Sequence, residues 1–191
     1  LFLIGTTCGI LTNLHLHPDE RRLDALLRQA DEQMRTALRA LAEAADARNP
    51  LILLGETLRQ ADEWAAKNAE NSLTDAPTRE IHYINMRRQQ RRILLQVTKD
   101  AQKVQGHPPQ EAEVRALIGR IFAEYDREND CTSLLSALHD LLAEMQRQPL
   151  PATRGEFEDR ALLYVLLRRM EDFLLLKREF YETYGFEKIT N

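Results

Sequence analysis

The sequence predicts an all-α fold, a bundle of five or six helices that is preceded by the end of a transmembrane helix. Three observations lead to this prediction. Glycine and proline are scarce, at 7 each in 191 residues, whereas residues that favour helices, such as alanine, leucine, arginine and glutamate, are abundant. Apolar residues recur at intervals of three and four along most of the chain. No stretch shows the alternation of apolar and polar residues that is typical of strands.

The first fourteen residues, Leu1 to Leu14, carry no charge and no initiator methionine, and the rest of the chain is strongly charged. A helix that crosses a bilayer needs about 20 apolar residues, so this stretch is too short to cross alone. We interpret residues 1–16 as the cytoplasmic end of a truncated transmembrane helix and residues 17–191 as a helical cytoplasmic domain. The alternative is a buried first segment of an ordinary soluble protein.

Prolines, glycines and asparagines mark the ends of the predicted helices. Gly106 and the prolines that follow it form the clearest break. Asn129 or Asp130 is expected to cap the fifth helix. The expected helices run from Pro18 to about Asn49, Pro50 to Ala69, Thr78 to Gln105, Gln110 to Tyr125, Asp130 to Gln148, and Arg154 to Tyr184.

The centre of the last helix, Ala161 to Leu167, reads ALLYVLL and is apolar on every side. A helix that is apolar all round is normally buried all round. The charged residues that flank it leave too short a run for a second membrane span. The pattern therefore predicts that this helix is the central and most buried one.

The third predicted helix places two polar residues on its apolar stripe. The stripe runs through Tyr83, Arg87, Gln90 and Leu94. A buried arginine is costly unless a carboxylate pairs with it. One interpretation is a structural ion pair between helices, drawn from Arg87, Glu158, Arg160 and Glu171, with Glu158 or Glu171 as the partner of Arg87. The other is an anion site in which Tyr83, Arg87, Gln90 and Arg91 bind a carboxylate ligand.

Two segments carry a resemblance to a known family. The segment Tyr83-Ile-Asn-Met-Arg87-Arg-Gln-Gln90-Arg-Arg-Ile93-Leu94 resembles the Tyr-x-x-Met-Arg-x-x-Gln-x-x-Ile-Leu pattern of the C-terminal domain of the putative aromatic acid exporter family. The segment from Leu150 through Tyr164 to Lys177 resembles the final helix of that domain. Arg91 and Arg92 carry more charge than the family pattern leads us to expect. The resemblance implies a cytoplasmic domain on an inner-membrane protein that exports aromatic carboxylic acids.

The implied location is the bacterial inner membrane, with this domain facing the cytoplasm. The expected partners are the membrane half of the same polypeptide, an aromatic carboxylate ligand and further copies of the chain. The expected role is regulation, ligand sensing or assembly. A membrane-tethered interaction or signalling module without transport activity is the alternative, and a soluble helical enzyme or ligand-binding bundle is the third hypothesis.

Composition and motifs argue against other classes of function. The net charge of −4 argues against nucleic-acid binding. The chain has no glycine-rich phosphate loop, no His-Glu-x-x-His motif and no Glu-x-x-His pair, and its five histidines are scattered. Cys8 and Cys131 are isolated, which suits a reducing compartment. We therefore expect no cofactor, no metal site and no enzymatic activity.

Overall fold

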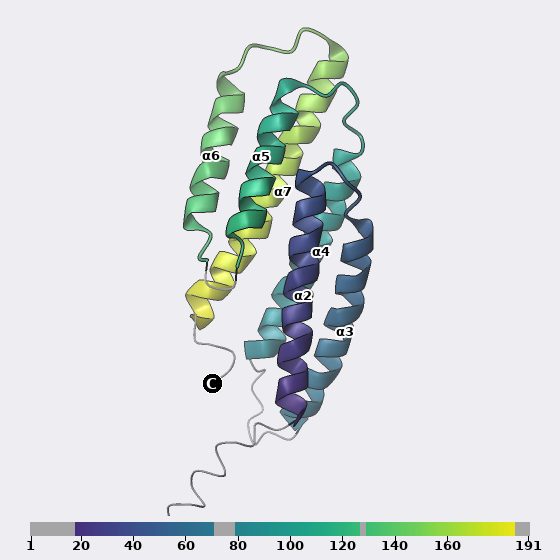
Figure 1. Cartoon of the computed structure of the whole chain (residues 1–191). Helices are drawn as coiled ribbons and strands as arrows, with labels where there is room; N and C mark the ends of the chain where they lie inside the picture. Colours follow the sequence, from purple (N-terminus) through teal and green to yellow (C-terminus); the bar gives the residue numbers. More distant parts are fainter. Residues whose placement is uncertain (1–17, 71–78, 127–128, 186–191) are drawn as a thin grey trace, which may run out of the picture.

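The computed structural model describes residues 18–70, 79–126 and 129–185. These residues form six helices and no strand, which confirms the predicted all-α bundle. The helices lie along one long axis (Figure 1). They are α2 Pro18–Ala42, α3 Arg48–Glu70, α4 Arg79–Ala101, α5 Pro109–Glu124, α6 Thr132–Arg147 and α7 Arg154–Tyr184.

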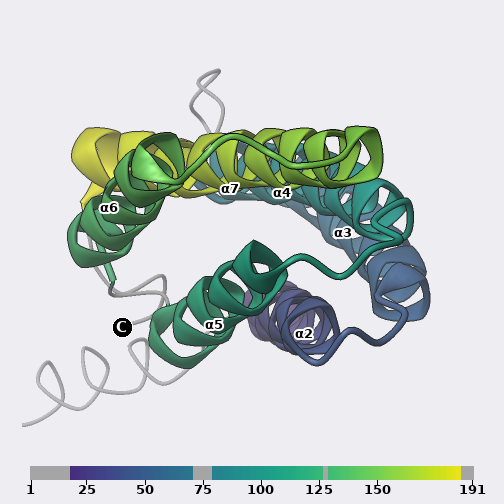
Figure 2. The same ribbon diagram turned by 90° about the horizontal axis from the view of Figure 1, so that it is seen from above.

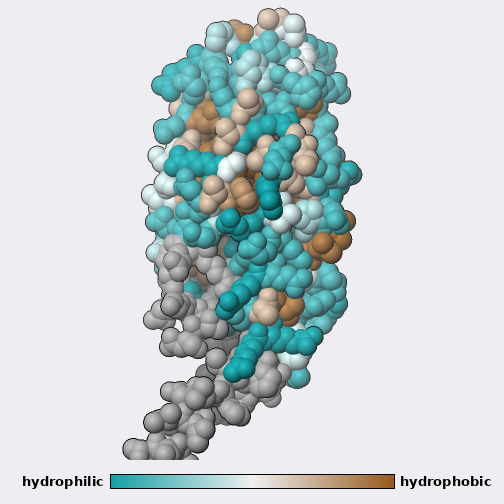
Figure 3. Space-filling view, viewed as in Figure 1, coloured by the Kyte–Doolittle hydropathy of each residue, from teal (hydrophilic) through white to brown (hydrophobic). Residues whose placement is uncertain are grey.

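The helices pack in two layers when the bundle is viewed along its axis (Figure 2). Helices α3, α4 and α7 form one row, in which α4 packs against both neighbours. Helices α2 and α5 form the opposite layer, and α6 packs against α7 and α5. The apolar stripes of the helices meet between the layers, so the core contains mainly leucine, alanine, isoleucine, valine and methionine. The face seen in Figure 3 is accordingly mostly hydrophilic, with smaller hydrophobic patches.

Helix α2 ends several residues earlier than the sequence pattern predicts, at Ala42. The amide of Ala45 donates to the carbonyl of Ala40 at 2.7 Å, and the amide of Ala44 donates to the carbonyl of Leu41 at 3.3 Å. This pair of hydrogen bonds is a Schellman motif, which terminates the helix. Ala44 occupies the left-handed position of the motif, with φ of 59°, where glycine is the usual residue. The turn at Ala44 therefore ends the helix, whereas the sequence pattern predicted an end at the later pair Asn49–Pro50.

The start of α7 is tied to the loop between α4 and α5. The hydroxyl of Thr153 accepts a hydrogen bond from the amide of Glu156 at 3.1 Å, which caps the helix. One turn later, the buried carboxylate of Asp159 accepts from the amides of Gln105 and Gly106 at 3.0 and 2.7 Å. Because a Cβ on Gly106 would lie 2.7 Å from Asp159 Oδ2, this close approach requires glycine.

The prediction that the centre of α7 is buried on every side is wrong. Leu163, Leu166 and Leu167 are buried, but Tyr164 and Val165 are 38% and 41% exposed. One face of α7 packs on α4, α5 and α6, and no other described helix covers the opposite face (Figure 2). An uninterrupted apolar run is thus only partly covered within one chain.

The predicted end of a transmembrane helix, residues 1–16, lies outside the described residues. Among the helices that the structure describes, none is long and apolar enough to cross a membrane. In the same residues, no group of three metal-ligating side chains comes together.

Candidate functional site

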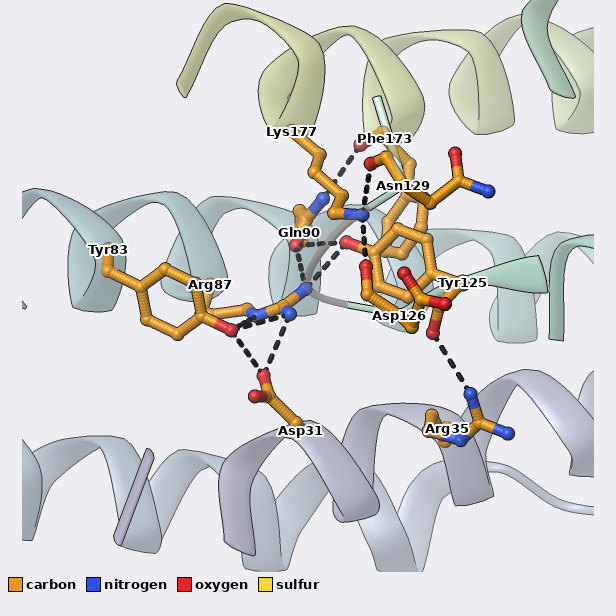
Figure 4. Close-up of polar contacts among 10 residues, drawn as sticks. All are labelled: Asp31, Arg35, Tyr83, Arg87, Gln90, Tyr125, Asp126, Asn129, Phe173 and Lys177. Carbon is orange, nitrogen blue, oxygen red and sulfur yellow. Dashed lines mark hydrogen bonds and ion pairs between the residues drawn. The ribbon is translucent and has the colours of Figure 1, made fainter. Parts of the chain in front are cut away.

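Arg87 lies at the centre of a buried polar cluster (Figure 4). Its side chain is 2% exposed, so the prediction that it lies inside the bundle is confirmed. Its Nη2 lies 2.7 Å from Asp31 Oδ1. Its Nε and Nη2 donate to the hydroxyl of Tyr83 at 3.1 and 2.7 Å, and its Nη1 donates to Gln90 Oε1 at 2.9 Å and to the hydroxyl of Tyr125 at 2.5 Å. We call these five residues the Arg87 cluster.

Four helices supply or hold the Arg87 cluster. Tyr83, Arg87 and Gln90 lie on one face of α4, at the spacing of three and four that brings helical side chains together. Asp31 reaches them from α2, and Tyr125 follows the last residue of α5. Helix α7 contributes a backbone carbonyl, because Gln90 Nε2 donates to the oxygen of Phe173 at 2.8 Å. The cluster therefore joins the two layers of the bundle.

The predicted carboxylate partners of Arg87 are wrong. The partner is Asp31 on α2, not Glu158 or Glu171 on α7. The carboxylates and the arginine that were expected to join Arg87 have partners of their own. These ion pairs are Arg154–Glu158, Arg160–Glu156, Arg168–Glu171 and His139–Glu171.

The reason for this error is geometric. Periodicity shows which face of α4 is buried, but it does not show which helix lies opposite each residue of that face. An ion pair does join α4 and α7, but α4 supplies the buried carboxylate and α7 the arginine, and the pair lies near the end of α4. Asp100 of α4 is 5% exposed and pairs with Arg169 of α7.

Arg91 does not join the Arg87 cluster, although the anion-site interpretation placed it there. Its Nε donates to the carbonyl of Leu51 at 2.5 Å, and its guanidinium lies over Gly55, where a Cβ would approach it to 2.7 Å. Arg91 therefore belongs to the contact between α3 and α4. Of the four residues expected to form a ligand site, the structure brings together Tyr83, Arg87 and Gln90.

The charges in the Arg87 cluster are stabilised by their surroundings. Burial alone would lower the pKa of Arg87, but the oxygens of Tyr125, Tyr83 and Asp31 outweigh it and hold this pKa well above its ordinary value. Burial raises the pKa of Tyr125, so its phenol stays protonated. It can then accept from Arg87 and donate to Gln90 Oε1 at 2.9 Å. The two tyrosine rings also flank the guanidinium, with Arg87 Cζ 4.9 and 5.2 Å from the ring centroids of Tyr83 and Tyr125.

Lys177 extends this network to the segment that follows α5 (Figure 4). Its side chain is buried, and its Nζ donates to the carbonyls of Asp126 and Asn129. The ammonium also lies 4.7 Å from the centroid of the Tyr125 ring. Burial lowers the pKa of Lys177 to about 8. Lys177 was not among the predicted site residues, although it follows Met170, Phe173 and Leu174 on the buried face of α7.

A separate cavity of about 270 Å³ lies where the ends of α2 and α4 meet α5 and α7. Its walls are mainly apolar, and the ion pair between Arg115 and Glu111 lies at its edge. No member of the Arg87 cluster lines it. Its walls include Leu41, Val104, Val114, Ile118, Leu163 and Leu166. A volume of this size can hold one aromatic ring.

The fold and the cluster define an all-α domain that is organised around a buried, fully coordinated arginine. The chain belongs to the family described as "Putative aromatic acid exporter C-terminal domain", which matches residues 14–178. This confirms the resemblance seen in the sequence. The family description names an exporter domain and no enzymatic activity.

The chain is also similar to a second bacterial protein and to a solved structure. The chain is 24% identical over 193 residues to "Uncharacterized protein YqjA" of Bacillus subtilis (strain 168), covering 94% of this chain and 58% of the relative. The chain thus spans little more than half the length of that relative. The fold matches "Crystal structure of putative membrane protein from Clostridium difficile 630" with a TM-score of 0.76 and 23% identity, covering 85% of this chain and 98% of the solved one.

Proposed function

We propose that this chain is the cytoplasmic C-terminal domain of an aromatic acid exporter-like protein of the bacterial inner membrane, and that it senses aromatic carboxylates through the Arg87 cluster. The family match supports the exporter assignment. The chain spans 58% of its Bacillus relative, which leaves room for a membrane half in a protein of that length. Transport itself would belong to that membrane half, and the domain described here would report the ligand to it.

The observation that carries this proposal is the chemistry around Arg87. The guanidinium contacts one carboxylate, from Asp31, and two phenols, from Tyr83 and Tyr125. A hydroxybenzoate carries the same two groups. A ligand carboxylate that replaces Asp31 keeps the deeply buried guanidinium paired, because an unpaired charge at that position is the costly alternative. The side chain of Asp31 is 15% exposed, so this exchange would take place at the solvent edge of the cluster.

The position of Asp31 supplies a route from ligand to membrane. Asp31 lies on α2, the helix that directly follows the segment predicted to end a transmembrane helix. Releasing Asp31 removes two contacts between α2 and α4, the ion pair with Arg87 and the hydrogen bond that the Tyr83 hydroxyl donates to Asp31 Oδ1. A ligand with different affinities for the two arrangements shifts the position of α2.

Calorimetric titration and thermal denaturation with 4-hydroxybenzoate test the proposal. The wild type should bind with heat and melt at a higher temperature at millimolar ligand. Asp31→Asn should bind 4-hydroxybenzoate about tenfold more tightly, because a neutral amide at position 31 competes with the ligand for the guanidinium less strongly than the carboxylate does. Arg87→Lys should lose the binding, because an ammonium cannot hold a carboxylate with two parallel hydrogen bonds.

Arg88→Ala is the matched control, since Arg88 is the next residue of α4 and pairs with Asp62 at the surface. This variant should bind the ligand like the wild type. Equal binding by the wild type and Arg87→Lys would contradict the proposal and would indicate the apolar cavity near Leu163 instead.

A second candidate function is an interaction or assembly module without a ligand. It is favoured by the complete coordination of Arg87, each of whose guanidinium nitrogens already has a protein partner. If 4-hydroxybenzoate gave neither heat of binding nor a shift in melting temperature with the wild type and Asp31→Asn, this candidate would be supported and the ligand-sensing proposal would be overturned.

A further inference from the structure

The outer face of α7 carries a regular strip of exposed residues. We define the outer strip as Arg154, Glu158, Ala161, Val165, Arg168 and Asp172. All six are exposed, and they follow one another at alternating steps of four and three. This spacing keeps side chains on one side of a helix and is the spacing of residues that meet a second helix. In the view along the bundle axis, no described helix lies on this side of α7 (Figure 2).

The charge pattern of the outer strip is complementary to that of a second copy that runs antiparallel to it. From the start of α7, the strip reads positive, negative, apolar, apolar, positive, negative. Read from the other end, the same strip is negative, positive, apolar, apolar, negative, positive. Opposite charges attract and like charges repel across a helix pair. Two copies of the strip therefore match at every position when they run antiparallel, and they oppose like charges at every charged position when they run parallel.

We propose that the outer strip of α7 binds the outer strip of a second copy of this chain, antiparallel and about a twofold axis near residue 163. Arg154 then faces the partner's Asp172, and Glu158 faces the partner's Arg168. Ala161 faces the partner's Val165 at the centre. A twofold axis repeats each contact, so the two helices share four ion pairs around an apolar centre.

The apolar surroundings of the outer strip favour a protein partner over water. Phe157 and Tyr164 flank the strip and are 61% and 38% exposed. Leu150, which is 91% exposed, borders the same area together with Phe157. A clustered set of exposed apolar side chains with a charged rim is typical of an interaction surface. It also accounts for the apolar run at Ala161 to Leu167, three of whose seven residues are exposed within one chain.

The charges of the outer strip are available for new partners. Arg154 Nε lies 2.8 Å from Glu158 Oε1, but the two side chains are 91% and 57% exposed, so this pair holds them weakly. Arg168 pairs with Glu171 and is 55% exposed. In the described part of the chain, no ion pair joins Asp172 to another side chain. Ion pairs to a second copy would therefore replace little that is already stable.

Sedimentation velocity of the 191-residue chain over micromolar concentrations tests this proposal. The wild type should dimerise, and its dissociation constant should rise with salt, because exposed ion pairs are screened. Glu158→Arg and Arg168→Glu should each raise the dissociation constant at least tenfold, since each places like charges opposite one another twice. The double variant should restore the dimer. An equimolar mixture of the two single variants should form a heterodimer, because every charged position is then complementary again.

Two kinds of control separate the interface from general effects of charge. Arg59→Glu and Glu63→Arg make the same changes in an exposed ion pair on α3 and should leave the dimer unchanged. Val165→Glu should break the dimer without lowering the melting temperature, because Val165 is exposed in the single chain. A wild type that stays monomeric at 200 µM would overturn the proposal, and so would a dimer that both single variants and Val165→Glu leave intact.

Discussion

Replacing Arg87 by alanine should destabilise the domain more than any change at its surface. The variant removes the ion pair with Asp31 and the hydrogen bonds that Arg87 donates to Tyr83, Gln90 and Tyr125. These groups are buried and lose a charged donor together. Removing one partner of a buried ion pair costs about 3–5 kcal/mol. We expect about 3 kcal/mol here, at the low end, because Asp31 retains some contact with water.

Urea denaturation followed by circular dichroism measures this free energy of unfolding. In a domain of this size, about 3 kcal/mol corresponds to a fall in melting temperature of about 10 °C. The matched control is Arg88→Ala, whose ion pair with Asp62 has a similar length of 2.9 Å but side chains that are 35% and 43% exposed. That change should cost less than about 1 kcal/mol.

The apolar double variant sharpens this prediction. Arg87→Met combined with Asp31→Leu removes both charges of the pair, and it should be much less destabilising than Arg87→Ala, because no buried charge loses its partner. The hydroxyls of Tyr83 and Tyr125 still lose a donor, and the Tyr83 hydroxyl also loses its acceptor, Asp31 Oδ1, so some cost should remain. Equal costs for Arg87→Ala and Arg88→Ala would show that the buried ion pair of Arg87 stabilises the fold no more than a surface pair does.

Three further predictions concern other parts of the bundle. Ala44→Gly should raise the free energy of unfolding by about 0.5–1 kcal/mol, because glycine occupies the left-handed position without strain, whereas Ala45→Gly in the same turn should not stabilise; urea denaturation of both variants checks this. Gly106→Ala should lower the melting temperature by several degrees, because the new Cβ would meet Asp159, and Gly155→Ala, whose Cβ would meet nothing within 4 Å, is the control. The pKa of Lys177 is about 8 in the fold and higher in the unfolded chain, so the unfolded state binds more protons above pH 8 and the contribution of Lys177 to stability should rise from pH 8 toward pH 10. From pH 7.5 to pH 9.5, the melting temperature of the wild type should therefore rise relative to that of Lys177→Met. An equal change in melting temperature for both proteins would contradict the lowered pKa of Lys177.

The sequence was sufficient to predict the fold class and most helix ends. The last helix begins at Arg154 and ends at Tyr184 as predicted, because its start has a threonine cap and its end precedes a glycine. Burial of Arg87 and Gln90 was also predictable, since the three-four stripe of α4 passes through both. These features depend on residues that are near one another in the chain.

The partners of the buried residues could not be predicted in this way. Asp31 and Tyr125 lie far from Arg87 in the sequence, and a single sequence shows the buried face of each helix without showing which faces meet. The prediction that the apolar run of α7 is buried on every side failed for a related reason. The composition of this run does not distinguish a residue that is buried in the chain, such as Leu167, from one that stays exposed, such as Val165. Lys177 was predictable in principle, because its spacing from Phe173 and Leu174 places it on the buried face.

The most direct test of the ligand-sensing account is the side-chain NMR signal of Arg87 during titration with 4-hydroxybenzoate. The Nε–H group of Arg87 is buried and donates to Tyr83, so it should give a resolved, slowly exchanging signal that is absent from Arg87→Lys. Exchange of Asp31 for the ligand carboxylate should shift this signal in a saturable way, while the signals of surface arginines such as Arg88 stay in place. An Arg87 signal that does not move at 10 mM ligand would contradict the account and would leave the cluster as a purely structural element of the bundle.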